Sequence, residues 1–199
     1  MAFLHHTLKR GCHFSSQHIY WIHFIHQSLY KGVHMLSKTI QDAINDQITK
    51  EFSSGYFYLS MSAYFQSVNL PGCAQWMRLQ YQEEVSHGLK LFDYVHEREG
   101  HVVLDEIPQP KSKFKSTLDV FEQALAHEQE VSEMINKLYA LTQKEKDYPT
   151  EIELQWFITE QVEEEKNARA IVEQIKMVGD NKVALLMLDR QLGMRSAGK

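Results

Sequence analysis

The chain has 199 residues, enough for one domain with a substantial hydrophobic core. It holds only 9 glycines, 4 prolines and 2 widely separated cysteines, which disfavours a β-sandwich, a disulfide framework and a zinc-ligand pattern. The formal charge is −5 at pH 7, no basic nucleic-acid footprint is present, and no apolar run is long enough to span a membrane. We therefore expect no nucleic-acid or membrane partner, and a reducing cytoplasm as the location.

Residues 1–34 differ in composition from the rest of the chain. They hold three basic residues, seven of the 11 histidines and no acidic residue. The remaining residues carry 18 basic and 26 acidic side chains, and so a net charge of −8. An acidic body of this kind favours cations as partners.

Four interpretations of residues 1–34 stay open. A secretory signal peptide is disfavoured, because the apolar run "IYWIHFI" contains a histidine and no small-residue cleavage site follows it. A transit peptide fits the absence of acids but not the scarcity of arginine, and a His-rich metal-binding tail fits the composition but not the irregular spacing. The fourth is a misassigned start, since "KGVHM" can be encoded by a purine-rich, ribosome-binding type of sequence just before the ATG of Met35. We expect residues 1–34 to be a disordered extension or a misassigned start, and residues 35–199 to form the functional domain.

The position of the native N-terminus tests the misassigned start. If translation begins at Met35, mass spectrometry of the protein from its own cells yields no peptide from residues 1–34. Detection of any such peptide contradicts this interpretation.

Four long segments without internal proline predict helices, at about residues 36–67, 73–99, 117–145 and 150–178. Pro71 and Gly72 mark a turn after the first helix, and residues 101–116, with two prolines, read as a long connection. Thr150 with Glu153 three residues later predicts a capping box, and Gly179 suits the end of the fourth helix. A short fifth helix is expected at about 182–194. Two short connections flanking one long one predict an all-α, ferritin-like four-helix bundle with one crossover and a short C-terminal fifth helix.

Each of the four helices has an apolar stripe with steps of three and four residues, and a glutamate interrupts each stripe near its middle. The stripes are Ile44, Ile48, Glu51, Gly55, Tyr58, Ser62; Met77, Gln80, Glu84, His87, Leu91, Tyr94; Leu118, Phe121, Leu125, Glu128, Ser132, Ile135; and Phe157, Gln161, Glu164, Ala168, Ile171, Ile175. On one helix, the simplest explanation of such a glutamate is that the stripe is assigned one residue out of place and the glutamate faces solvent. Four helices with a glutamate in the middle of the stripe are harder to explain in this way, although helices with many acidic residues produce some such patterns by chance. If the four meet in the core, their like charges require metal cations.

The residue types indicate which metal such a site binds. Glu84 and His87 are three residues apart, so both project from one turn of a helix. Carboxylates with one imidazole suit iron or manganese, and the absence of thiolates argues against structural zinc. A glutamate that bridges two cations makes the site dinuclear and able to deliver two electrons to dioxygen. The residues therefore favour a di-iron carboxylate site.

Four motifs resemble the bacterial non-haem ferritins. They are "KEFSSGYFYLSMSAYF", "QEEVSHGLKLFDYV", "AHEQEVSEMINKLYALTQKEKDYPT" and "LQWFITEQVEEEKNARAIV". They occur in family order and spacing, and the resemblance extends from Met35 to about Met194. Residues 1–34 lie outside it.

The resemblance implies a ferroxidase centre. One iron is expected on Glu51, Glu84 and His87, and the second on Glu84, Glu128 and Glu164, with Glu84 bridging. Gln161 matches a position beside the centre that contacts oxygen species or solvent, and Tyr58 matches a tyrosine that can supply an electron. A weaker third iron site is expected at Glu83, Glu160 and Glu163. His96 and His127 are expected to be surface or packing residues, and Trp76 and Trp156 to be core.

The resemblance also implies a function and an assembly. Fe(II) would be oxidised by dioxygen or peroxide and stored as ferric oxyhydroxide inside a homo-oligomeric cage of 24 subunits. The sequence departs from related di-iron proteins at two positions. Gln161-x-x-Glu164 replaces the second Glu-x-x-His motif that many of them carry. Val85 stands where the haem-binding members have methionine, so we expect no haem. The alternatives are a peroxide-scavenging di-iron protein or a non-catalytic metal buffer. The first is disfavoured by the absence of Cys-x-x-Cys, and the second by the complete ligand set.

Overall fold

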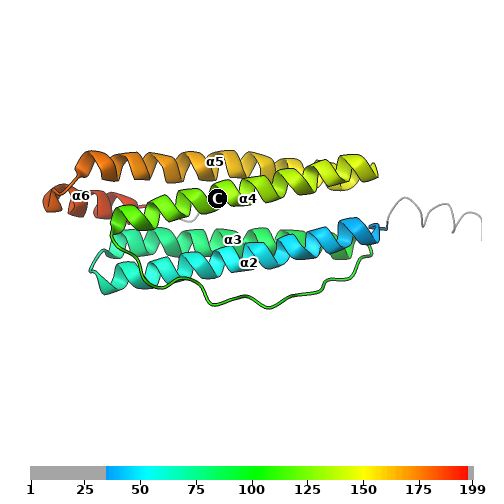
Figure 1. Cartoon of the computed structure of the whole chain (residues 1–199), viewed down its shortest axis with the longest axis horizontal. Coiled ribbons are helices and arrows are strands. Elements are labelled where there is room, and N and C mark those ends of the chain that lie inside the picture. Colours follow the sequence, from blue (N-terminus) through cyan, green and yellow to red (C-terminus); the bar gives the residue numbers. More distant parts are fainter. Residues whose placement is uncertain (1–34, 197–199) are drawn as a thin grey trace, which may run out of the picture. The chain divides into compact units, whose positions relative to one another are not determined.

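The computed structural model describes residues 35–196, and this part of the chain is all-α, with no strand. Its helices are α2 (Lys38–Ser67), α3 (Pro71–Glu97), α4 (Thr117–Glu145), α5 (Tyr148–Val178) and α6 (Lys182–Leu192), as Figure 1 shows. The first four form the bundle and α6 is the short fifth helix, which confirms the predicted fold class. Within the described residues, no helix is long and apolar enough to cross a membrane. The predicted extension, residues 1–34, lies outside the described part.

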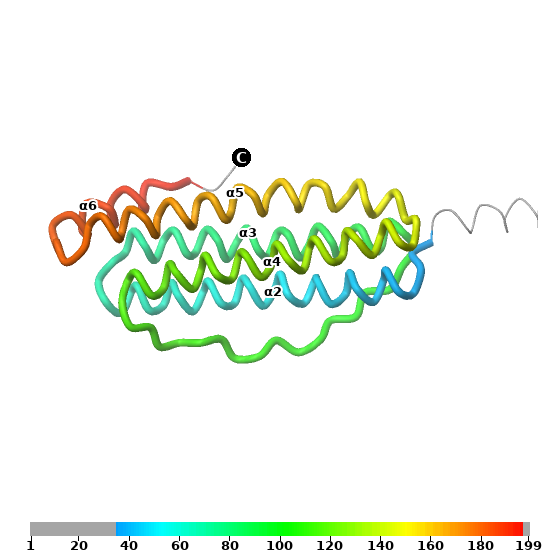
Figure 2. Tube along the Cα trace, turned by 45° about the horizontal axis from the view of Figure 1, so that its top comes forward, coloured from blue at the N-terminus to red at the C-terminus, as the bar shows by residue number. Residues whose placement is uncertain are grey.

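The long connection between α3 and α4 determines the topology of the bundle. It runs the length of the bundle beside α2, so that α4 starts at the same end as α3 (Figure 2). Hydrogen bonds hold it there: the Asn45 side chain donates to the carbonyl of His101 (3.1 Å), and the Ser60 hydroxyl donates to the carbonyl of Lys111 (2.6 Å). The two hairpins, α2–α3 and α4–α5, therefore pack as antiparallel pairs with α3 and α4 parallel to each other.

Most helix ends follow the local signals of the sequence. Ser116 is the N-cap of α4, and its hydroxyl accepts a hydrogen bond from the N–H of Asp119 (3.1 Å). Gly179 ends α5, as expected, with a φ of 54°, a left-handed value that favours glycine. The second helix starts earlier than predicted, because Pro71 occupies its first turn instead of a separate turn. Proline is tolerated there, since that position has no helical partner for an N–H.

The predicted capping box at Thr150 is wrong. Asp147 is the N-cap of α5 and accepts from the N–H of Thr150 (3.3 Å). The hydroxyl of Thr150 is buried and lies 2.8 Å from the Tyr94 hydroxyl, and it also accepts from the Arg98 guanidinium (3.0 Å). Arg98 in turn pairs with Asp147 at 3.0 Å. The cap is displaced because this end of α5 is organised around a buried arginine that needs acceptors.

The bundle core consists of two apolar clusters separated by a polar layer. One cluster includes Tyr58, Phe65, Trp76, Phe121 and Ile171, and the other includes Ile44, Leu91, Ile135, Leu154 and Phe157. We define the polar layer as the seven buried residues Glu51, Gln80, Glu84, His87, Glu128, Gln161 and Glu164. Each helix therefore passes from apolar to polar and back to apolar.

The predicted stripes of α2, α3 and α5 are buried throughout. On α4, Phe121, Glu128 and Ile135 are buried, but Leu118, Leu125 and Ser132 are only partly so. Val120, Ala124 and Val131 of α4 are buried as well, so its buried face is shifted from the predicted stripe. Trp76 is buried as expected, whereas Trp156 is 39% exposed, so the prediction that it belongs to the core is wrong.

Helix α6 docks onto the beginning of α3. A Cβ atom at Gly72 would lie 1.7 Å from the carbonyl oxygen of Asp189, so only glycine permits this approach. The N-cap residue Leu70 offers no side-chain cap, but the carboxylate of Asp189 accepts from the N–H of Cys73 at 2.8 Å. Asp189 thus caps α3 from a distant part of the chain and places a negative charge at the positive end of that helix.

We expect Asp189→Ala to lower the free energy of unfolding by about 1–2 kcal/mol, because the N–H of Cys73 loses its acceptor. Asp189→Asn keeps an acceptor oxygen and should lose less. Urea-induced unfolding of the two variants and the wild type measures the difference. Equal stability of Asp189→Ala and the wild type would show that this cap contributes nothing.

Candidate metal centre

The polar layer receives residues from all four long helices. Glu51 comes from α2, Gln80, Glu84 and His87 from α3, Glu128 from α4, and Gln161 and Glu164 from α5. None of the seven side chains is more than 6% exposed. The four stripe glutamates predicted from the sequence are therefore all buried.

Three of these residues form a tight group of metal-ligand type. Glu51, Glu84 and His87 each offer one ligand atom, and these atoms all lie within 4.8 Å of one another. Glu84 Oε2 is 3.9 Å from His87 Nδ1, and Glu51 Oε2 has no hydrogen-bond partner among residues 35–196. A buried carboxylate oxygen without a partner is costly unless a cation binds it. The donor set, two carboxylates and one imidazole, suits Fe(II).

Glu84 also interacts electrostatically with Glu128 and Glu164. Burial raises the pKa of Glu84 well above its ordinary value, and the charges of Glu128, Glu51 and Glu164 raise it further. Burial and the charge of Glu128 raise the pKa of Glu164 to about 8. No lysine or arginine in the described residues forms an ion pair with any of the four glutamates, so the layer lacks a direct counter-charge of its own.

Amide side chains hold three of the carboxylates in place. Gln47 donates to Glu51 Oε1 (2.8 Å), Gln80 to Glu164 Oε2 (2.8 Å) and Gln161 to Glu128 Oε2 (3.1 Å). Neither Gln47 nor Gln80 has a predicted functional role. Gln80 lies on the predicted stripe of α3, and Gln47 precedes Glu51 by one helical turn. In each case the helical spacing places the amide on the same face of the helix as a buried glutamate, and this was the available sign that it could bind a carboxylate of the polar layer.

Tyr58 is buried beside the polar layer. Its hydroxyl donates to Glu128 Oε1, and burial together with the charge of Glu128 raises its pKa well above the ordinary value. The edge of its ring contacts His127, whose Nε2 lies 2.8 Å from the Ser54 hydroxyl. Burial lowers the pKa of His127 to about 4, so this histidine is a neutral packing residue.

The predicted third group lies outside the buried layer. Glu160 is partly buried, and its pKa is raised by burial and by the charges of Glu163 and Glu83, which places the three carboxylates within electrostatic range. Glu83 is not free, because Arg195 pairs with it at 2.6 Å. No motif in the sequence indicated this arginine.

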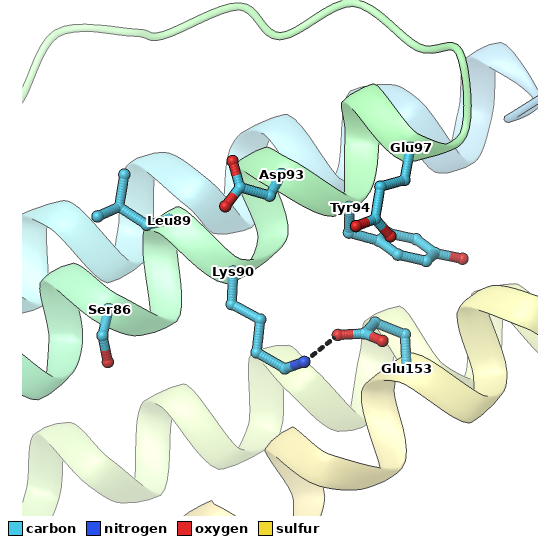
Figure 3. Close-up of a pocket in the computed structure, with 7 residues that line it drawn as sticks. All are labelled: Ser86, Leu89, Lys90, Asp93, Tyr94, Glu97 and Glu153. Atoms are coloured by element: carbon cyan, nitrogen blue, oxygen red, sulfur yellow. Dashed lines mark ion pairs between the residues drawn. The ribbon is translucent and has the colours of Figure 1, made fainter.

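A surface groove between α3 and α5 lies beside the site but is distinct from it. Figure 3 shows Lys90 of α3 reaching Glu153 of α5, at 2.5 Å. The groove has a volume of about 420 Å³, and no polar-layer residue lines it. Lys90 also lies 5.0 Å from the ring of Trp156, which contacts the His87 ring edge-on at 5.3 Å. Trp156 thus covers His87 on this side.

The raised pKa values predict how the stability of the metal-free protein depends on pH. Glu51 and Glu164 ionise near pH 7 and 8 in the folded state, against an ordinary value of 4.5. The folded state therefore holds more protons than the unfolded one, and the free energy of unfolding falls as pH rises from about 6.5 to 8. The lowered pKa of His87, about 4 against 6.5, acts only below this window, where it reduces stability as pH falls.

Urea unfolding at a series of pH values measures this effect. Saturating Zn²⁺ should weaken the dependence, because the cation replaces the protons. Glu164→Gln should also weaken it in the metal-free protein. Metal-free stability that is constant or rises between pH 6.5 and 8 would contradict the prediction.

Comparison with known proteins agrees with this geometry. The sequence profile described as "Ferritin-like domain" matches residues 41–178. A "Bacterial non-heme ferritin" of Staphylococcus haemolyticus is 38% identical over 162 residues, covering 81% of this chain and 98% of the relative. One from Bacteroides fragilis is 40% identical over 161 residues, covering 81% and 100%. The open pore ferritin of Archaeoglobus fulgidus, a solved structure, is 44% identical with a TM-score of 0.80, covering 81% and 98%. The chain therefore belongs to the ferritin family.

Proposed function

We propose that this protein stores iron and oxidises Fe(II) at the polar layer. The observation that carries the proposal is the meeting of four buried glutamates and one histidine, from four helices, between two apolar clusters. Like charges in such a layer are compatible with folding only when they are protonated or bound to cations.

The proposed ligands follow the arrangement of the side chains. One Fe(II) binds Glu51, Glu84 and His87, whose ligand atoms already lie within 4.8 Å of one another. The second binds Glu84, Glu128 and Glu164, which interact electrostatically, so that Glu84 is shared. Gln161 and Tyr58 both hydrogen-bond to Glu128 and hold it toward the second iron.

The chemistry needs two electrons from two Fe(II) ions. Dioxygen accepts these electrons and two protons and becomes hydrogen peroxide, and the two iron ions leave as Fe(III). The side chains of the layer orient and charge-balance the iron, while burial excludes bulk water. The raised pKa values of Glu51 and Glu164 mean that iron binding releases protons at neutral pH.

Storage requires a cage, which we propose to be a homo-oligomer of 24 subunits in which Fe(III) mineralises as ferric oxyhydroxide. The near-complete coverage of relatives named ferritins supports this assembly. Helix α6 also supports it, because Val183, Leu186 and Met187 are 69%, 51% and 68% exposed and need a covering surface. Copies of α6 from neighbouring subunits would provide that surface.

Aerobic addition of Fe(II), followed by ferric absorbance and particle size, tests the proposed function. We expect a large particle, and a rate of oxidation at least about tenfold lower in the double variant Glu84→Ala, His87→Ala, because metal affinity depends on these ligands. The matched control is His96→Ala, Glu97→Ala, the same residue types at exposed positions on the same helix. A rate unchanged by the first pair, or a particle of monomer or dodecamer size, contradicts the proposal.

A further inference from the structure

The imidazole of His87 is oriented in a different way from the carboxylates of the polar layer. Amide side chains hold Glu51, Glu128 and Glu164, but neither ring nitrogen of His87 forms a hydrogen bond with another of residues 35–196. Glu84 Oε2 is 3.9 Å from His87 Nδ1, too far for a hydrogen bond. A metal-binding histidine is usually oriented by a hydrogen bond from its second ring nitrogen. Within the described part of the chain, packing must therefore orient this ring.

Two consecutive aromatic residues of α5 contact the imidazole edge-on. The ring centres of Trp156 and Phe157 lie 5.3 Å and 6.0 Å from that of His87, with angles of 84° and 76° between the ring planes. The two aromatic rings are themselves 4.8 Å apart and meet at 89°. Edge-to-face contacts of this kind are favourable and have a defined geometry. The two rings therefore form a corner that orients the imidazole.

The fold holds these two rings to different degrees. Phe157 is 2% exposed and belongs to one of the apolar clusters of the core, whereas Trp156 is 39% exposed. Exposed side chains change rotamer within nanoseconds unless a neighbour restrains them. Trp156 thus needs a support outside the core to keep its contact with His87.

An ion pair between α3 and α5 provides that support. Lys90 lies three residues after His87 on α3, and Glu153 lies three residues before Trp156 on α5. The Lys90 ammonium is 2.5 Å from Glu153 Oε1 and 5.0 Å from the centre of the Trp156 ring. Figure 3 shows the lysine and the glutamate reaching toward each other from the two helices. The pair joins the helix that carries His87 to the helix that carries its aromatic corner.

We propose that Lys90 and Glu153 are positioning residues for His87 and act on it through Trp156. The glutamate holds the ammonium on the indole, the indole keeps its edge against the imidazole, and the imidazole keeps Nδ1 beside Glu84. This pair therefore sets the affinity for the cation that His87 helps to bind. The inference rests on the proposed function, because it requires a cation at that ligand group.

The sign of the effect distinguishes positioning from direct electrostatics. The charge of Lys90 by itself repels a cation at His87, so removal of that charge alone would strengthen cation binding. Positioning predicts the opposite. Without Lys90 the indole moves, the imidazole spends less time in its binding orientation, and the apparent affinity falls in proportion.

Titration of the full-length protein with Zn²⁺ at pH 7, followed by calorimetry, tests this without iron oxidation. The phase that depends on His87 is the one lost in His87→Ala. We expect Lys90→Met to weaken this phase about two- to fivefold, the strength of an exposed cation–π contact, and Lys90→Arg to retain the affinity. Trp156→Ala should weaken it about tenfold. In the Trp156→Ala protein, Lys90→Met should cause no further loss, because the indole through which Lys90 acts is gone.

The matched control is Lys176→Met. Lys176 also joins two helices, because it pairs with Glu122 of α4 at 3.9 Å, and its removal should leave the His87 phase unchanged. Unchanged or stronger binding in Lys90→Met overturns the inference. An equal loss in Lys176→Met, or a further loss from Lys90→Met in the Trp156→Ala protein, also overturns it. Absence of any His87-dependent phase in the wild type would instead overturn the proposed function.

The mobility of the indole gives a second, independent readout. In a variant with Trp21→Phe and Trp76→Phe, Trp156 is the sole tryptophan left. Time-resolved fluorescence anisotropy should show an indole that is restrained on the nanosecond timescale, and Lys90→Met should add a fast component that Lys176→Met does not. An indole that is equally mobile with and without Lys90 overturns the inference.

Discussion

The burial of four like charges in one layer is the constraint on which this structure depends. Transfer of an ionised carboxylate from water into a protein core costs several kcal/mol even after relaxation. Here Glu51, Glu84, Glu128 and Glu164 are all nearly inaccessible, and burial is the main reason that their pKa values are raised. Apolar clusters above and below supply the folding free energy that offsets this cost. The polar layer therefore interrupts what would otherwise be a uniform apolar core.

The surrounding architecture brings these charges together. The crossover makes α3 and α4 parallel (Figure 2). Hydrogen bonds from Tyr58 to Glu128 and from Gln80 to Glu164 join the middle of one hairpin to the middle of the other. Helices α2 and α3 also approach closely there, since a Cβ atom at Gly88 would lie 2.8 Å from the ring of Phe52. Glu51 and His87 are the chain neighbours of these two residues. The packing of the Phe52 ring against Gly88 thus brings Glu51 and His87, the proposed ligands of one cation, close to each other.

Periodicity made much of this predictable, because a helix repeats its faces every three to four residues. Glu51, Glu84, Glu128 and Glu164 were located by that rule, and the connection lengths gave the topology. Contacts between distant segments were not predictable. Asp189 caps α3 from α6, and Arg98 takes the hydroxyl of Thr150 that the local sequence assigned to a cap. Arg195 has no periodic signal, since it follows the last helix, and its partners depend on how α6 folds back.

The central claim is that the polar layer binds two divalent cations through a shared Glu84. Anomalous diffraction at the iron edge, from crystals soaked anaerobically with Fe(II), tests it most directly. The account predicts two anomalous peaks in the core, one beside Glu51 and His87 and one beside Glu128 and Glu164, with Glu84 between them. A core without anomalous density, while iron is bound only at the surface, would contradict it.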